Sequence, residues 1–108
     1  MERGIEFLRK AFDKKGFIRV RVRVKKGKKN KIRNIRLSST DNAFILHIKE
    51  ELISLGVRPV IYKIGRSYCV DIEGKAKLER FSQFIGFSDE GKKRQLEEAL
   101  KPLSLQGV

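Results

Sequence analysis

The sequence indicates an α+β protein in which two β-hairpins form one antiparallel sheet and helices cover one face of that sheet. Apolar residues recur every three or four positions in some segments, as in helices, and every second position in others, as in strands. In chain order these segments give an αββαββα(α) arrangement with a four-stranded sheet. The 108 residues are expected to form a single domain, residues 1–108.

The first helix and the first hairpin are predicted from residues 1–38. Residues 1–15 carry apolar side chains at helical spacing and end before Gly16, a typical helix stop. Residues 17–24 alternate strictly, with β-branched side chains expected to face a core and basic side chains expected to face away from it. The two sets are Ile18, Val20, Val22 and Val24 on the core side, and Arg19, Arg21, Arg23 and Lys25 on the other side.

A polar turn is expected at residues 26–30, followed by the return strand at residues 31–38. The alternation places Ile35 and Leu37 inward, and it places Asn34, Arg36 and Ser38 on the exposed side with the basic residues. Ile32 does not fit this alternation, so a bulge or an irregular start is predicted there.

The second half of the chain repeats the pattern of helix and hairpin. Residues 41–55 are predicted to form a helix that Ser39 or Thr40 caps and Gly56 ends. Strands are predicted at residues 57–64 and 67–73, with Tyr62, Ile64, Tyr68, Val70 and Ile72 facing inward. Helices are predicted at residues 77–84 and 91–103, the last with apolar residues at Leu96, Leu100 and Leu103.

The positive charge of the chain is concentrated in residues 9–36. This segment contains fourteen of the 26 Lys and Arg residues and a single acidic residue, Asp13, so it carries the whole formal charge of +13. The remaining residues have equal numbers of basic and acidic side chains. A fold that gathers its charge in this way has one strongly positive face, which attracts a polyanion such as nucleic acid.

Composition argues against several other classes of protein. No apolar run approaches the ~20 residues that a membrane span requires, so no membrane partner is predicted. Cys69 alone can form neither an internal disulfide nor a zinc site, and no cofactor or metal is predicted. The cytoplasm is the expected location, at the nucleoid if the source is prokaryotic. The high content of Lys, Arg and Glu is typical of a thermophile.

Several segments resemble the LAGLIDADG homing endonuclease family. Residues 7–16, FLRKAFDKKG, are similar to its signature helix, which in many members reads close to FLRGLFDADG. Residues 35–41, IRLSSTD, resemble the passage from the second strand to the second helix. Residues 68–74 and 78–87 resemble the fourth strand and the third helix, and residues 92–96 resemble the last helix. The resemblance covers nearly the whole chain in the family's order.

The resemblance implies a saddle of antiparallel strands that lies in the DNA major groove. It also implies two such units whose signature helices pack side by side, each with a metal-binding acid just before the final glycine. Here that position is Lys15, and Asp13 keeps only the earlier acid. A lysine repels Mg²⁺, so no catalytic residue is predicted. Lys10 replaces the glycine that allows close helix packing, so a homodimer is expected to lack the family's tight seam.

The sequence therefore predicts a non-catalytic protein that binds double-stranded DNA through a basic sheet face, in the role of a regulator derived from a homing endonuclease. Arginine suits guanine edges and phosphates, asparagine suits adenine, and lysines at a hairpin tip suit backbone phosphates. Lys15 is expected to contact phosphate in place of the metal. The predicted contact residues are Lys15, Arg19, Arg21, Arg23, Lys25, Lys26, Lys28, Lys29, Lys31, Arg33, Asn34, Arg36 and Lys63.

Three other functions stay open at this point. RNA binding by a maturase-like splicing factor follows from the same resemblance, although strands with exposed aromatic pairs for stacking unpaired bases are not obvious. A residual metal-dependent endonuclease would use Glu73 and Lys75 with another acid such as Asp71. A small assembly protein would use the basic face to bind an acidic partner.

Overall fold

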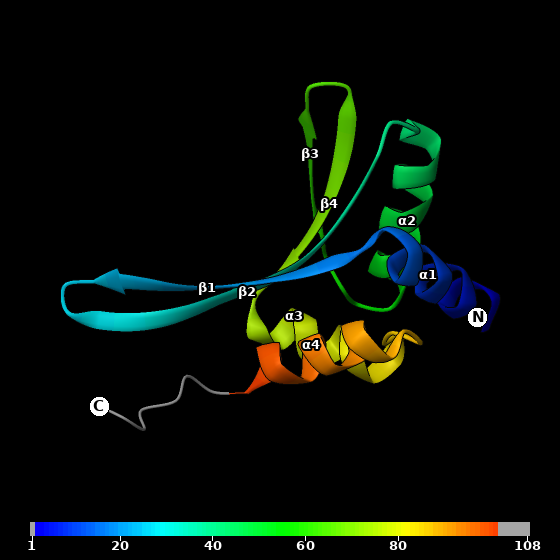
Figure 1. Ribbon diagram of the computed structural model, residues 1–108. Helices are drawn as coiled ribbons and strands as arrows, with labels where there is room; N and C mark the ends of the chain where they lie inside the picture. Colours follow the sequence, from blue (N-terminus) through cyan, green and yellow to red (C-terminus); the bar gives the residue numbers. More distant parts are fainter. Residues whose placement is uncertain (1, 102–108) are drawn as a thin grey trace.

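A computed structural model describes residues 2–101 and contains one four-stranded sheet and four helices (Figure 1). The predicted order αββαββαα is observed. In chain order the elements are α1 (Glu2–Lys15), β1 (Phe17–Lys25), β2 (Lys28–Ser39), α2 (Asn42–Ser54), β3 (Val60–Ile64), β4 (Ser67–Glu73), α3 (Lys75–Phe84) and α4 (Glu90–Leu100). Within this part of the chain, each helix is too short or too polar to cross a bilayer.

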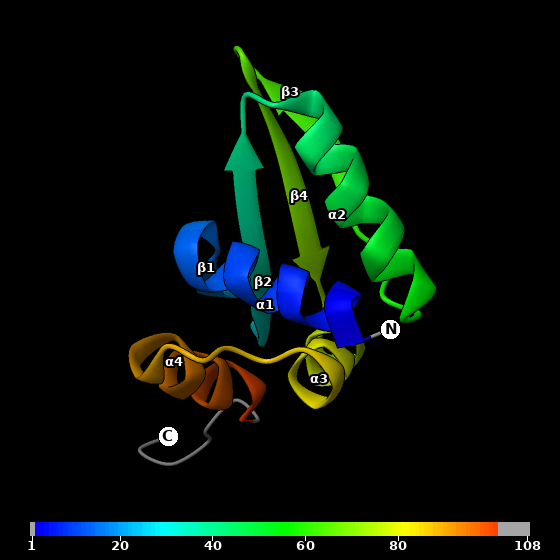
Figure 2. The ribbon, with the colours of Figure 1, turned by 90° about the vertical axis from the view of Figure 1, so that its right-hand side faces the viewer.

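The sheet has the strand order β1-β2-β4-β3, and every neighbouring pair is antiparallel. Each hairpin therefore supplies one half of the sheet, and β2 and β4 join the halves in the middle. In Figure 2, α1 crosses in front of the sheet, α2 runs beside β4, and α3 and α4 lie below. The helices pack on the side chains of β2 and β4 that point to one face, which are Ile35, Leu37, Val70 and Ile72, all fully buried.

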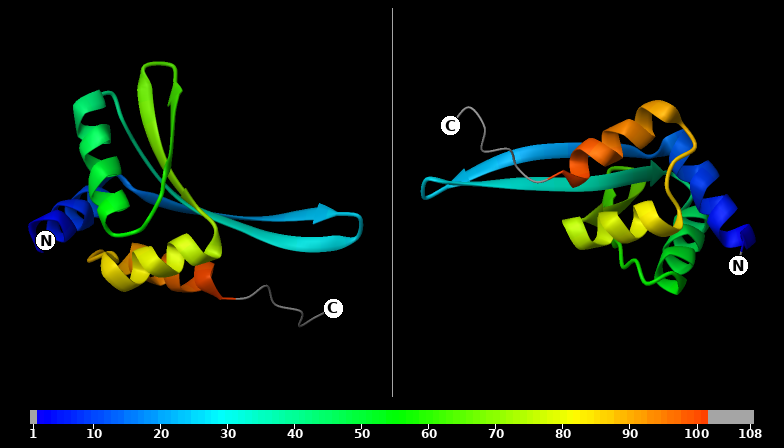
Figure 3. Two further views of the ribbon diagram at one scale, coloured as in Figure 1. Left: turned by 180° about the vertical axis from the view of Figure 1, so that it is seen from behind. Right: turned by 90° about the horizontal axis from the view of Figure 1, so that it is seen from below.

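The β1–β2 hairpin extends well beyond the helices (Figure 3). Its apolar side is therefore largely uncovered: Val20, Val22 and Val24 are 45%, 53% and 63% exposed, whereas Ile18 is half-buried. The prediction that these three valines face a core is wrong. Alternation shows which side chains share a face, but the reach of the helices determines how far that face is covered.

Strand pairing in this hairpin is continuous from Phe17 opposite Arg36 to Lys25 opposite Lys28. The bulge predicted at Ile32 is absent from this pairing, and β2 begins at Lys28 instead of residue 31. The turn consists of two residues only, Lys26 and Gly27, both with positive φ (52° and 78°). Turns of this kind match the twist of the flanking strands, so pairing continues to the tip.

The β3–β4 hairpin differs from the prediction in the orientation of β3. Ile61 lies opposite Val70, so Ile61 faces the helices, while Tyr62 and Ile64 face the other side of the sheet. The predicted inward orientation of Tyr62 and Ile64 is therefore wrong, and that of Val70 and Ile72 is right. In this strand both alternating sets are apolar, so the sequence pattern does not distinguish the two faces. β3 also begins at Val60, three residues later than predicted.

Helix ends follow local chemistry, with one correction. Asp41, rather than Ser39 or Thr40, caps α2: its carboxylate accepts a hydrogen bond from the backbone N–H of Phe44 at 3.2 Å. Gly56, with φ of 79°, follows the end of α2 as predicted. The predicted helical residue Leu103 lies outside the described residues.

Candidate nucleic-acid interface

One face of the sheet lies away from the helices, and we call it the open face. Side chains alternate along a strand, so the residues of β1 on the side opposite Ile18 belong to the open face. These basic residues are Arg19, Arg21, Arg23 and Lys25, which lie opposite Asn34, Ile32, Asn30 and Lys28 of β2. They repeat at intervals of about 7 Å along the strand.

The outer basic residues of this face are solvent-exposed and are not engaged in ion pairs. Arg21, Arg23 and Lys25 are exposed, and Arg19 is half-buried. None of the ion pairs found in residues 2–101 includes a basic residue of β1. With Lys26 of the turn and Lys28 and Lys29 at the start of β2 added, the projecting hairpin is a continuous arm of positive charge. Such an arm attracts phosphates and can follow a groove.

The middle of the open face is arranged around Asp71. Its carboxylate accepts hydrogen bonds from Asn34 Nδ2 at 2.6 Å and from the Tyr62 hydroxyl at 3.4 Å. It also forms an ion pair with Arg36, with 3.6 Å between Nη2 and Oδ2. The Arg36 guanidinium lies 5.5 Å from the centre of the Tyr62 ring. Burial and the nearby Asp71 carboxylate raise the pKa of Tyr62 above its usual value.

The contacts around Asp71 show that the predicted exposure of Asn34 is wrong, and they show why. Asn34 was expected to be exposed, but it is only 3% exposed and its amide donates to Asp71. Asp71 is 37 residues away along the chain, so no local pattern could reveal this bond. The sequence pattern suggests Asp71 only as a metal ligand and places Tyr62 in the core. Both are central to the open face instead.

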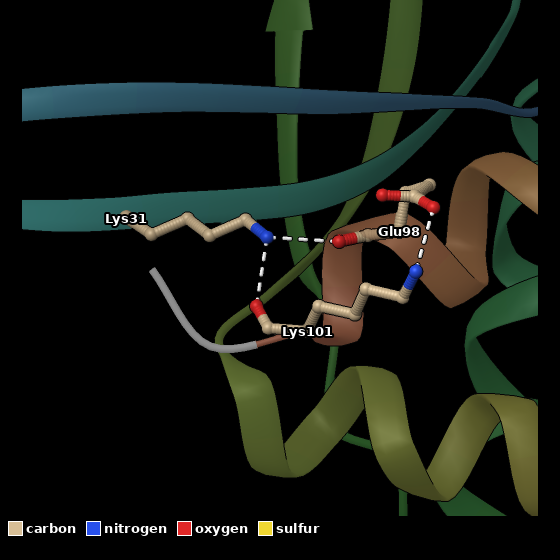
Figure 4. Close-up of polar contacts among 3 residues, drawn as sticks. All are labelled: Lys31, Glu98 and Lys101. Atoms are coloured by element: carbon tan, nitrogen blue, oxygen red, sulfur yellow. Dashed lines mark hydrogen bonds and ion pairs between the residues drawn. The ribbon is translucent and has the colours of Figure 1, made fainter. Parts of the chain in front are cut away.

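Four other predicted contact residues of the sheet lie away from the open face. Lys29, Lys31 and Arg33 share the helix side of β2, where they lie opposite the valines of β1. Lys63 lies beside Tyr68 with its amine 5.4 Å from the ring centre. Figure 4 shows that the Lys31 amine donates to the backbone oxygens of Glu98 and Lys101, both at 2.8 Å. Lys31 therefore caps the carboxyl end of α4. Its pKa is lowered by burial and then by the positive charge of Arg33.

At the end of α1, ordinary structural bonds engage the groups that the resemblance singles out. The Asp13 carboxylate accepts hydrogen bonds from the backbone N–H groups of Ser88 at 2.8 Å and Asp89 at 3.2 Å. The Lys92 amine donates to the backbone oxygens of Phe12 and Asp13. Lys15 is exposed, and its amine lies 5.3 Å from the centre of the Phe44 ring.

The acidic side chains considered as metal ligands are dispersed among residues 2–101. No group of three or more His, Cys, Asp and Glu side chains lies close enough together there to hold a metal ion. Of the acids considered for a residual nuclease, Asp71 has three partners and Glu73 is exposed at the end of β4. The role of Lys92 at the end of α1 was not foreseen, because the contact joins residues about 80 positions apart.

Among known proteins, the fold has counterparts in solved structures. No protein-family model and no curated protein matches the sequence. The homing endonuclease I-TnaI aligns with 88% of this chain and 67% of its own, at 14% identity and a TM-score of 0.69. The homing endonuclease I-CvuI, solved in complex with the I-CreI target, aligns with 92% of this chain and 64% of its own. The identity is 16% and the TM-score is 0.69.

A third structure, the LAGLIDADG homing endonuclease I-GzeII in complex with its DNA target, matches at 14% identity with a TM-score of 0.67. The match covers 88% of this chain but 33% of that chain, so the present chain spans about one third of I-GzeII and about two thirds of the other two. Similarity at this level of identity concerns the fold. The chain therefore has the fold of one LAGLIDADG homing endonuclease unit, as the resemblance of its signature segments implied.

Proposed function

We propose that this protein binds double-stranded DNA with its open face, the β1–β2 hairpin lying along a groove. The observation that carries the proposal is the row of basic side chains on β1, which point to one side and have no ion-pair partner within residues 2–101. The fold adds support, because I-CvuI and I-GzeII, which share it, were solved in complex with DNA targets.

The dimensions of the hairpin suit this role. The major groove of B-DNA is about 12 Å wide and admits a two-stranded ribbon. In that position Arg21 and Arg23 reach base edges or phosphates from the open face of the hairpin. Lys26, Lys28 and Lys29 reach the DNA backbone from the hairpin tip. Arg36 contributes less to readout than an unpaired arginine would, because Asp71 and the Tyr62 ring engage it.

The proposal includes binding without cleavage. The resemblance to LAGLIDADG nucleases implies a metal-binding acid at the position that Lys15 occupies. The nearby Asp13 carboxylate accepts hydrogen bonds from two backbone N–H groups. A cation at that position disfavours a second cation such as Mg²⁺. Lys15 is exposed, and its amine is suited to contact a phosphate near the end of α1.

The test is a fluorescence-anisotropy titration with random duplex DNA, single-stranded DNA and structured RNA over a series of salt concentrations with Mg²⁺. If about six phosphates are neutralised, log K is expected to fall with log salt at a slope near −5 on the duplex. The double variant Arg21→Ala, Arg23→Ala should weaken binding at least tenfold. The exposed α4 residue Arg94 provides a control, because Arg94→Ala removes one charge from outside the open face.

Each outcome of the titration leads to a different conclusion. Steep salt dependence on duplex DNA, with intact strands on a denaturing gel, is the expected result. A preference for structured RNA would favour the maturase-like alternative. Cut strands would contradict binding without cleavage, and equal losses in the open-face and Arg94 variants would contradict a role for the hairpin.

A further inference from the structure

A polar cavity lies at the edge of the sheet where β4 ends and β2 continues without a neighbour on that side. The last β2–β4 pair joins Asn34 to Glu73, and the backbone N–H of Gly74 still donates to the Arg33 oxygen at 3.1 Å. The cavity has a volume of about 420 Å³. Its lining includes Arg23, Lys31, Arg33, Glu73, Gly74 and Lys75, so four basic residues surround it.

Arg33 is the unusual residue of this cavity. It is only 7% exposed, and its Nε and Nη1 atoms have no hydrogen-bond partner anywhere in residues 2–101. A buried guanidinium is normally paired, because removing a charge from water without compensation is costly. Unsatisfied buried donors of this kind point to a ligand that completes their hydrogen bonds.

A second set of donors borders the same cavity at the amino end of α3. The residue before the helix is Gly74, with φ of 106° and ψ of 148°, and no side chain caps the first turn. The first backbone N–H groups of a helix have no partner within it, and the helix dipole favours an anion beside them. At α2 and α4 the same need is met by the carboxylates of Asp41 and Asp89.

None of the ion pairs within residues 2–101 includes a basic residue of the cavity lining. The Lys31 amine is held by two backbone oxygens, and its lowered pKa reflects burial and the positive charge of Arg33. Glu73 is the one acid in the lining, and alternation along β4 directs it to the open face, away from the helix side that Arg33 occupies. No ion pair joins Glu73 to these cations within the described part of the chain.

From these observations we propose that the cavity binds a phosphate group, held between the Arg33 guanidinium and the amino end of α3. A guanidinium fork and helix N–H groups together match the several acceptor oxygens of a tetrahedral oxyanion. We assign the backbone phosphate of bound DNA as its source, because Arg23 lines the cavity and also belongs to the open face. This assignment of the source, unlike the phosphate site, rests on the proposed function.

The site is tested with inorganic phosphate at constant ionic strength, followed by the NMR shifts of the backbone amides of residues 75–77 and of the Arg33 side-chain Nε–H. We expect saturable shifts in the wild type, with a dissociation constant in the millimolar range or tighter. Arg33→Met should weaken binding at least tenfold, while Arg94→Met, which removes an exposed charge elsewhere, should leave it unchanged. Shifts that do not saturate in the wild type would overturn the site.

Thermal unfolding shows whether Arg33→Met acts through the ligand. Because Arg33→Met removes a buried charge without a partner, its midpoint in phosphate-free buffer should equal or exceed that of the wild type. Phosphate should then raise the unfolding midpoint of the wild type until the site is saturated. The midpoint of Arg33→Met should show only the gradual rise that excluded salts cause. Equal responses of the two proteins would overturn the proposal. If Arg33→Met does not fold, the wild-type NMR titration still decides.

Duplex affinity distinguishes the sources of the phosphate. With a backbone phosphate in the cavity, Arg33→Met should weaken duplex binding about fivefold or more, and Arg94→Met should not. Phosphate binding with unchanged duplex affinity would assign the cavity to free phosphate and overturn the DNA source. Phosphate binding in a protein that binds no DNA would support the site while contradicting the proposed function. Duplex binding without phosphate binding would support the proposed function and contradict the phosphate site.

Discussion

Asp71 is the acceptor around which the middle of the open face is organised. It receives an amide and a guanidinium from β2 and a phenol hydroxyl from β3, and two of these partners, Asn34 and Tyr62, are shielded from solvent by the arrangement. A carboxylate with several donors fixes the rotamers of its partners. Asp71 therefore determines where Arg36 lies on the surface proposed to meet DNA.

Asp71→Ala should destabilise the protein by about 1–3 kcal/mol, because it leaves the buried Asn34 amide and Arg36 without an acceptor. Urea unfolding measures this loss. Glu73→Ala provides the control: it removes an acid from the same face, but that acid is exposed, and its effect should stay within about 0.5 kcal/mol. Similar losses in both variants would show that the bonds to Asp71 contribute little.

Tyr62 predicts how stability depends on pH in the alkaline range. Its pKa in the folded protein is raised above 10.0, first by burial and then by Asp71, so folding favours the neutral phenol. The resulting stabilisation is fully present below the unfolded pKa and is lost as pH rises through the folded pKa. The difference in unfolding free energy between wild type and Tyr62→Phe should therefore shrink as pH rises above about 10. A difference that is independent of pH would contradict this prediction.

Lys31 connects two elements that are far apart in sequence. By donating to the backbone oxygens of Glu98 and Lys101, it attaches the end of α4 to the middle of β2. The carboxyl end of a helix has unpaired oxygens and a partial negative charge, and a lysine satisfies both. Lys31, which was predicted to bind nucleic acid, therefore holds α4 against β2.

Lys31→Met should cost about 1 kcal/mol of stability and should increase hydrogen exchange in the last turn of α4, because the helix loses its cap. Native-state hydrogen exchange followed by NMR measures both effects. Lys29→Met serves as the matched control, since Lys29 is an exposed residue of the same strand near the hairpin turn. Unchanged exchange in α4 would show that Lys31 does not hold the helix.

At the scale of the whole molecule, charge is divided between a basic arm and a neutral body. The segment with the charge of +13 forms the end of α1 and the β1–β2 hairpin, which extends past the helices (Figure 1). Lys15, the last residue of α1, carries one of the charges of this segment. Lys15→Ala should weaken duplex binding and reduce the slope of log K against log salt by about 0.9, the value for one phosphate contact. Unchanged affinity and slope would remove Lys15 from the interface.

The outer side of α1 also predicts the oligomeric state. Lys10, Lys14 and Lys15 line a hollow of about 250 Å³ together with Phe7 and Phe44. A two-fold seam along this helix would bring these lysines close to their copies, and like charges at low dielectric repel. We therefore expect a monomer of 12.5 kDa without DNA at low salt, as measured by sedimentation. Lys10→Gly should increase self-association, and a wild-type dimer with α1 at its seam would contradict this expectation.

Local sequence determined the order of elements, the helix limits near Gly16 and Gly56 and the segment that carries the charge. Each of these depends on neighbours within one helical turn or one strand, and periodicity records such neighbours directly. The same patterns supported the resemblance from which the fold was expected.

Tertiary structure alone decided which face of the sheet Tyr62 occupies, how deeply Asn34 and Arg33 are buried, and that Lys31 caps a helix. It also decided that the valines of β1 are exposed beyond the last helix. The burial of Asn34 and the role of Lys31 depend on packing between segments 37 and 70 residues apart, in the Asn34–Asp71 and Lys31–Lys101 contacts. A local pattern contains no information about such partners, because it is the folded chain that brings them together.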